Sequence, residues 1–138
     1  MKKTFFLIGL LSLTACSQGV TDSTKMVDES FNKKLECAKY ITQSEKRVEE
    51  YGREIAGEKG ASWPNMEKVF YSLKANSCLY LWSNNMVNGL NNRIDRGLND
   101  ALSGEELVRE IYIKDDASLG NEPEMLERFS AKIKPFIE

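Results

Sequence analysis

The sequence predicts an α+β domain in which a long N-terminal amphipathic helix packs on a small antiparallel sheet, followed by a C-terminal helix. Apolar residues recur every three, four or seven positions from residue 27 to residue 55, which is the spacing of one helix face. Apolar and aromatic residues flank a short polar segment at 74–77, as in a hairpin, and a second helical stripe follows Pro123. The alternative is a small all-α bundle, in which the aromatic segment is helical as well.

The first expected element is the amphipathic helix, which we place from about residues 22–24 to Gly57 and Gly60. Residues 22–24 carry side-chain oxygens that can accept hydrogen bonds from the first free amides of a helix. We expect the apolar stripe to face the core. Pairing with a second copy as a coiled coil is the alternative, although a sustained heptad repeat is missing. The stripe consists of Val27, Phe31, Leu35, Ala38, Ile41, Val48, Tyr51 and Ile55.

A turn region is expected at 57–65 and a β-hairpin at 67–83. Trp63 precedes Pro64 and is thereby biased toward extended backbone. Apolar and aromatic residues on both sides of the polar segment 74–77 favour two strands. A helix that begins at residue 62 or 65 also places several apolar residues on one face, and it is the alternative for this segment.

The asparagine-rich stretch 83–99 is expected to be largely a solvated loop. It contains six asparagines and two glycines, which are turn-forming residues. Residues 92–100 alternate weakly around Ile94 and Leu98 and predict an edge strand. The functional alternative makes the asparagines a surface that binds sugar or peptide.

The C-terminal part is expected to hold a short core element and a helix. Residues 103–106 resemble a helix entrance, because two glutamates lie where the helix dipole favours negative charge. The apolar residues 107–113 form the short element, which Asp115 and Asp116 end. The last helix begins at about Pro123 and stops before Pro135.

The first sixteen residues have the zones of an export signal: two lysines, an apolar run over 4–15, and a small residue before Cys16. Leu13-Thr14-Ala15-Cys16 resembles the lipobox of bacterial lipoproteins, which implies cleavage before Cys16 by signal peptidase II and a lipid on its sulfur. The run of twelve residues is too short to cross a bilayer, for which about 20 are needed. Ser17, which follows the cysteine, resembles the residue found at this position in lipoproteins that are sorted to the outer membrane. The resemblance therefore implies a periplasm-facing outer-membrane lipoprotein, or a cell-membrane lipoprotein in a host with one membrane.

The expected organisation is a signal peptide at 1–15, a lipidated tether at 16–24 and a single globular domain at 25–138. Cleavage leaves 123 residues with 17 basic and 21 acidic side chains, because the signal takes two lysines and no acids with it. This acidic balance, without a basic cluster, argues against nucleic acid as a partner. We expect contact with the membrane through the lipid on Cys16.

Cys37 and Cys78 remain as an even pair once Cys16 carries lipid. In an oxidising compartment such a pair favours a disulfide. The bond would close a loop of about 42 residues, for which the chain-entropy estimate is roughly 4 kcal/mol. Two buried free thiols and a redox pair are the alternatives.

Residues 70–80 carry a second resemblance. This segment is similar to one in small, uncharacterised, often prophage-borne exported bacterial proteins, in which the position of Leu73 is commonly proline. In those proteins an upstream helix carries a cysteine, as Cys37 does here, and a segment like 100–104 follows after another strand. The resemblance implies a helix packed on a small antiparallel sheet and a link between Cys37 and Cys78. It implies no activity.

The residues also restrict the chemistry. The chain has no histidine, which removes Ser-His and Cys-His nucleophile pairs and the commonest zinc ligand. Nucleotide-binding glycine motifs are missing too. We therefore expect no catalytic residues, no metal and no cofactor. Adjacent carboxylates occur at 49–50, 105–106 and 115–116, but neighbours on a helix point about 100° apart and are usually surface charges.

The expected function is a non-enzymatic interaction module that binds another envelope protein and is carried by a prophage or mobile element. Trp63, Tyr80 and Trp82 can form an exposed aromatic patch for such a partner, although core packing is the interpretation that we favour for each of them. The alternative function is a cell-wall glycan hydrolase that uses carboxylates, with the acids at 105–106 and 115–116 as its candidates.

Overall fold

The computed structural model describes residues 31–89 and 91–138. The predicted signal peptide, Cys16, the tether and the start of the predicted N-terminal helix lie outside these ranges and stay predictions. Among the described residues, no helix is both long and apolar enough to span a bilayer.

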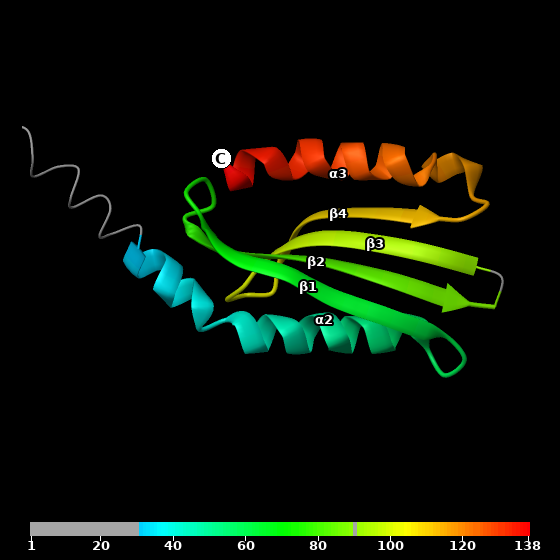
Figure 1. The fold of residues 1–138 in the computed structure, drawn as a ribbon, viewed down its shortest axis with the longest axis horizontal. Helices are drawn as coiled ribbons and strands as arrows, with labels where there is room; N and C mark the ends of the chain where they lie inside the picture. Colours follow the sequence, from blue (N-terminus) through cyan, green and yellow to red (C-terminus); the bar gives the residue numbers. More distant parts are fainter. Residues whose placement is uncertain (1–30, 90) are drawn as a thin grey trace, which may run out of the picture.

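The described chain is an antiparallel meander with a helix on either side (Figure 1). The strands lie in the order β1-β2-β3-β4, so each strand pairs with its neighbour in the sequence. The predicted α+β class is confirmed, and the all-α bundle is wrong. The elements are α2 (Ile41–Ala56), β1 (Ala61–Ser72), β2 (Ser77–Asn88), β3 (Asn91–Asp100), β4 (Glu106–Ile113), the 3-10 turn η1 (Ala117–Leu119) and α3 (Glu122–Ile137).

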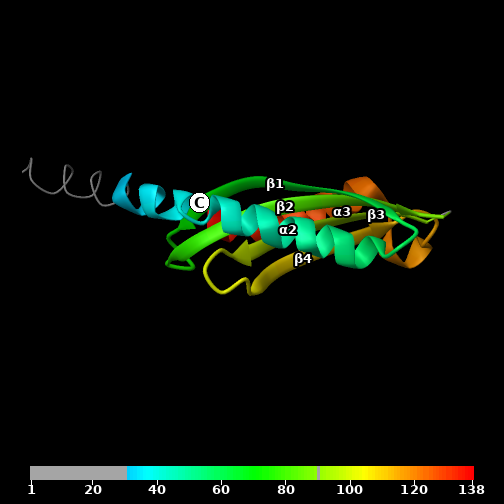
Figure 2. The same ribbon diagram turned by 90° about the horizontal axis from the view of Figure 1, so that it is seen from below.

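The two helices cover opposite faces of the sheet (Figures 1 and 2). Successive residues of a strand point to opposite faces. On β2, Tyr80 and Trp82 pack with Val48 of α2, whereas Leu79 and Leu81 pack with Phe129 of α3. Burial of each such apolar side chain contributes about 2 kcal/mol. The strand β2 therefore supplies both halves of the core.

The predicted N-terminal helix is interrupted within the described chain. Residues 31–38 are helical, Lys39 and Tyr40 form a turn, and α2 begins at Ile41. The face of α2 that packs on the sheet carries Ser44, Val48, Gly52 and Ala56 rather than the largest apolar residues. Small residues let the helix approach β1 closely, since a Cβ on Gly52 would lie 2.7 Å from Ser62 Oγ.

The predicted apolar stripe is only partly buried. Val48 is in the core, and Tyr51 and Ile55 are half-buried, but Phe31, Leu35 and Ile41 are exposed. The expectation that the whole stripe faces the core is therefore wrong for Phe31 and Leu35, which precede α2, and for Ile41, its first residue. The physical reason is that residues 31–38 extend beyond the end of the sheet (Figure 1), so their outward side has nothing to pack against.

The hairpin predicted at 67–83 is confirmed, and the helical alternative is wrong. Strands β1 and β2 pair from Ser72 and Ser77 outward, around a turn at 73–76. Asn76 adopts a left-handed backbone with φ 49°, which asparagine tolerates better than most residues. The turn region expected at 57–65 is shorter, because β1 already begins at Ala61. Pro64 fits there because β1 is an edge strand.

The asparagine-rich stretch is a second hairpin and not a loop. Strand β2 continues to Asn88 and β3 begins at Asn91, with Gly89 at φ 65° in the turn. The strand expected at 92–100 exists, but it is interior, because β4 pairs with its outer side. Local turn preference is overridden here because two long neighbouring strands satisfy the backbone.

The segment 103–106 does not start a helix: Glu106 opens strand β4. The predicted C-terminal helix is confirmed. It begins at Glu122, behind a capping box in which Asn121 and Glu124 exchange hydrogen bonds. It does not stop before Pro135 but continues to Ile137. The proline is tolerated because it removes a single backbone donor close to the end of the helix.

Candidate functional site

Cys37 and Cys78 form a disulfide, with Cα atoms 5.3 Å apart, which is within the usual range. This confirms the expected bond over the free-thiol alternative. The bond fastens helical residues 31–38 to the beginning of β2. Cys37 is almost completely buried, so the disulfide is shielded on that side.

The candidate carboxylates of a hydrolase do not come together. The acids at 105–106 lie at the beginning of β4, and those at 115–116 lie beyond its end. Eight strand residues separate two such points by about 25 Å, whereas a glycosidase needs its two carboxyl groups about 5–10 Å apart. Asp116 instead caps η1, and Asp115 sits in a turn with φ 71°.

Two surface clefts of the described chain have volumes of about 460 and 480 Å³. One lies between the end of α2 and β1, and the other lies beside the disulfide. The first contains Glu49 and the second contains Glu36 as their acidic lining residues. Neither cleft therefore holds the pair of carboxylates that hydrolysis of a glycan requires.

The three aromatic residues considered as an exposed patch lie in different environments. Tyr80 and Trp82 are core residues, whereas Trp63 is exposed on β1. The indole of Trp82 lies over Gly97, where an added Cβ would come within 2.3 Å of the ring. Its Nε1 donates to Asn99 Oδ1 at 2.6 Å. The prediction of an exposed aromatic patch is therefore wrong for Tyr80 and Trp82, which pack in the core of the sheet.

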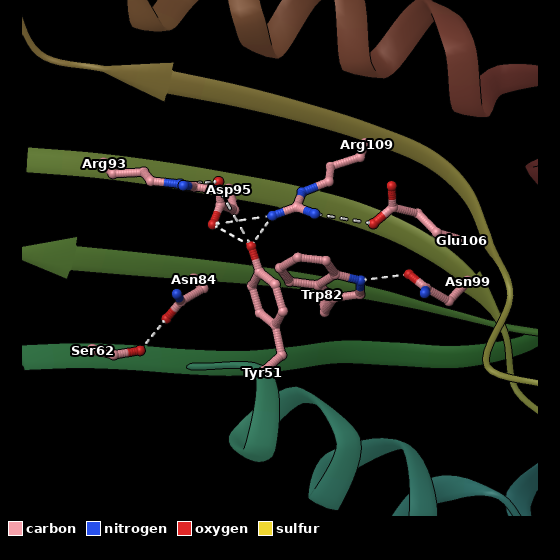
Figure 3. Close-up of polar contacts among 9 residues, drawn as sticks. All are labelled: Tyr51, Ser62, Trp82, Asn84, Arg93, Asp95, Asn99, Glu106 and Arg109. Atoms are coloured by element: carbon pink, nitrogen blue, oxygen red, sulfur yellow. Dashed lines mark hydrogen bonds and ion pairs between the residues drawn. The ribbon is translucent and has the colours of Figure 1, made fainter. Parts of the chain in front are cut away.

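A polar cluster on the α2 side of the sheet surrounds the fully buried side chain of Asp95 on β3 (Figure 3). Asp95 Oδ1 accepts from Arg93 Nε at 2.8 Å, and Oδ2 accepts from the Tyr51 hydroxyl at 2.7 Å. Arg109 of β4 donates to the same hydroxyl oxygen and lies 3.9 Å from Asp95 Oδ2. We call Tyr51, Arg93, Asp95 and Arg109 the arginine cluster.

The fold positions each member of the arginine cluster. Arg93 and Asp95 are two residues apart on β3 and therefore share a face. Arg109 joins them because it lies opposite Gly97 in the neighbouring strand. Tyr51 reaches across from α2. The centroid of its ring lies 4.8 Å from the ring centroid of Trp82 and 4.9 Å from Cζ of Arg109.

The electrostatics of the cluster favour binding over acid–base catalysis. Burial, followed by the hydrogen bond to Asp95, raises the pKa of Tyr51 far above its usual value, so the hydroxyl keeps its proton. Burial alone would lower the pKa of Arg93, but the hydrogen bond and charge of Asp95 outweigh it and raise the pKa. The cluster thus combines two permanent cations with one buried carboxylate, each oxygen of which accepts a hydrogen bond from within the cluster.

The arginines retain donors that no described residue uses. Their side chains are 23% and 26% exposed. Arg109 Nε is buried and has no hydrogen-bond partner in the described part of the chain, so an outside anion would bind the exposed atoms of the guanidinium groups. Arg109 also lies 3.5 Å from Glu106 at the rim. Helix α2 lies over β1 and β2, so β3 and β4, which carry the two arginines, extend beside the helix (Figures 1 and 2). Guanidinium groups so arranged can bind a carboxylate or phosphate.

Sequence reasoning missed the arginine cluster. Its signal was the alternation Arg93-x-Asp95-x-Gly97, which places three residues on one face of a strand. The asparagines around it led instead to a loop or an edge strand. Tyr51 was assigned to the core, and its hydroxyl partner lies 44 positions further along the chain.

No metal site is evident in residues 31–89 and 91–138, where no three histidine, cysteine, aspartate or glutamate residues gather. Comparison with known proteins gives no match to a family model, to a curated protein or to a solved structure. The function must therefore be inferred from the residues of this chain.

Proposed function

We propose that this chain is an exported lipoprotein, anchored to the periplasmic side of the outer membrane by lipid on Cys16, that acts as a non-enzymatic interaction module. The observation that carries the proposal is the disulfide between Cys37 and Cys78, because such bonds persist in oxidising compartments outside the cytoplasm. The N-terminal sequence, with its lysines, apolar run and lipobox-like ending, points to the same compartment.

The partner in this proposal is another envelope protein that presents a carboxylate to the arginine cluster. Arg93 and Arg109 are held in place by Asp95 and Tyr51, so little side-chain freedom is lost when an anion binds. The resemblance to prophage-borne exported proteins suggests that the partner belongs to the bacterial host of a mobile element.

Intact-mass measurement of the chain purified from bacterial membranes tests the anchor. The expected mass corresponds to a chain that begins at Cys16 and carries a diacylglycerol, with Cys37 and Cys78 oxidised. Cys16→Ser should remain unprocessed and leave the other two cysteines paired. A wild-type mass with residues 1–15 attached, or without lipid, would contradict the proposal.

Recovery of partners from solubilised envelopes tests the binding face. Arg93→Gln combined with Arg109→Gln should lose the proteins that the wild type retains. The matched control is Lys59→Gln combined with Lys114→Gln, which removes the same charge at exposed positions outside the cluster. Thermal unfolding of both variants shows whether the fold is kept. Equal recovery by a folded cluster variant and by the control would refute this binding face.

A further inference from the structure

Exposed apolar side chains gather at the end of the body where helical residues 31–38 join it. This end also holds the β1–β2 turn, the β3–β4 turn and the end of α3, as both ribbon views show (Figures 1 and 2). The side chains are Phe31, Leu35, Leu73, Leu102 and Ile137, which are 58%, 53%, 78%, 65% and 44% exposed. We call these five residues the apolar end. They come from four separate segments of the chain.

Contacts between side chains confirm that the four segments meet. Lys33 Nζ lies 3.5 Å from Asn76 Oδ1, which joins the first helical residues to the β1–β2 turn. Lys74 of that turn lies 4.8 Å from the ring centroid of Phe136 in α3. The cleft beside the disulfide is lined by both Lys33 and Leu102, which adds the β3–β4 turn.

Leu102 is presented by an ordered turn. Asp100 Oδ1 accepts hydrogen bonds from the backbone of Leu102 and Ser103, at 2.9 and 2.8 Å. Arg47 donates to the carbonyl groups of Ala101 and Leu102 at 2.8 and 3.1 Å. With its polar groups bonded inward, the turn points a leucine into solvent. One exposed leucine is ordinary, but five large apolar residues at one end indicate an interaction surface.

The charges differ between the two ends. The exposed charged side chains around the apolar end include Lys34, Lys39, Lys74 and Lys134 and the carboxylates of Glu36, Glu105, Glu106 and Glu138. Glu138 is paired with Lys134 at 3.5 Å. The opposite end carries the exposed acids Glu58, Asp115, Glu122 and Glu124 beside the exposed lysines Lys59 and Lys114, so acids outnumber bases there. Lysines beside apolar side chains suit a phospholipid surface, where the charged groups reach the headgroups.

We propose that the apolar end rests on the phospholipid surface of the membrane and that its leucine and phenylalanine side chains enter the interface. This inference rests on the proposed lipid on Cys16. The 30 residues before Phe31 join the body at this end. Even a fully extended segment from Cys16 to Phe31 reaches only about 50 Å, so lipidation holds this end, where the segment joins the body, within reach of the bilayer. A weak contact then suffices, because tethering raises its effective concentration to the millimolar range.

Tryptophan quenching in vesicles tests the orientation. The full chain, expressed with its own N-terminus and purified from membranes, is placed in vesicles of phosphatidylethanolamine and phosphatidylglycerol with brominated acyl chains. The native protein provides its own control, because Trp63 is exposed on β1 towards the opposite end and Trp82 is buried. Leu102→Trp adds a third tryptophan at the apolar end. We expect bromine to quench about one third of the total tryptophan emission of this variant, because one of its three tryptophans enters the interface. Little of the wild-type emission should be quenched.

A second substitution tests the apolar contact itself. Leu73→Asp in the Leu102→Trp background should reduce the quenching at least twofold, whereas Val87→Asp, at an exposed site on the far half of β2, should not. Equal quenching of wild type and Leu102→Trp in a lipidated sample would overturn the orientation and leave the proposed function intact. A sample whose mass shows no lipid on Cys16 would contradict the proposed function, and this inference with it.

Discussion

Removal of the disulfide should destabilise the domain strongly. The perturbation is Cys37→Ala combined with Cys78→Ala. The two cysteines are 41 positions apart, and the chain-entropy relation for a loop of about 42 residues predicts a loss of about 4 kcal/mol at 25 °C. Because Cys37 is almost fully buried, its truncation adds about 1 kcal/mol for the lost packing. Domains of this size are stable by only about 5–15 kcal/mol, so a large share of the stability is at stake.

Urea unfolding followed by circular dichroism measures this loss. With a slope of about 1.5 kcal/mol per M, the midpoint of the variant should fall by roughly 3 M. The wild-type protein in excess reductant is the control, because it lacks the bond but keeps both side chains, and its midpoint should lie close to that of the variant. A midpoint shift below about 0.5 M in both samples would refute the reasoning that the cross-link restricts the unfolded chain.

Three further predictions concern the sheet. Asp95→Asn should lower the unfolding free energy by about 3 kcal/mol, because the variant leaves two half-buried guanidinium groups without their anion; thermal unfolding measures the loss, and no change would contradict the assigned cluster. Gly97→Ala should cost about 2–3 kcal/mol, since its Cβ collides with Trp82; tryptophan emission should shift to the red, and the control Lys114→Ala, at an exposed turn position, should leave it unchanged. Stability should also fall as the pH drops below about 4.5, because the pKa of Glu110 is lowered in the folded state.

The sign of the pH effect follows from the surroundings of Glu110. Burial would raise the pKa of this carboxyl, but hydrogen bonds and charges from Lys132 and Arg128 outweigh burial and lower the pKa. The stabilisation is therefore fully present above the unfolded pKa and is lost as the pH falls through the folded pKa. Glu110→Gln should flatten the pH dependence of the unfolding midpoint between about pH 5 and 3. An unchanged slope in this variant would show that other carboxyls carry the effect.

The sequence identified the elements whose signals are local. The polar segment between aromatic runs predicted the first hairpin, and the proline near Glu122 predicted the last helix. The cysteine pair predicted the disulfide. Each signal depends on residues close in the chain, or on a compartment that the N-terminus indicates. The predicted lipid anchor on Cys16 lies outside the described residues, and intact-mass measurement tests it.

Only the tertiary structure decided the pairing of strands and the location of the arginine cluster. Asparagines favour turns locally, yet the backbones of β2 and β3 are each hydrogen-bonded to one partner strand on either side, and Asn99 accepts a hydrogen bond from Trp82. Asp95 is tolerated inside the sheet because Tyr51 arrives from α2 and Arg109 from β4. Such partners are distant in sequence, and no local pattern encodes which distant side chain will balance a buried charge. The short-range spacing of the residues thus determined the type of most elements, whereas long-range pairing determined which polar groups are buried and which apolar ones remain exposed.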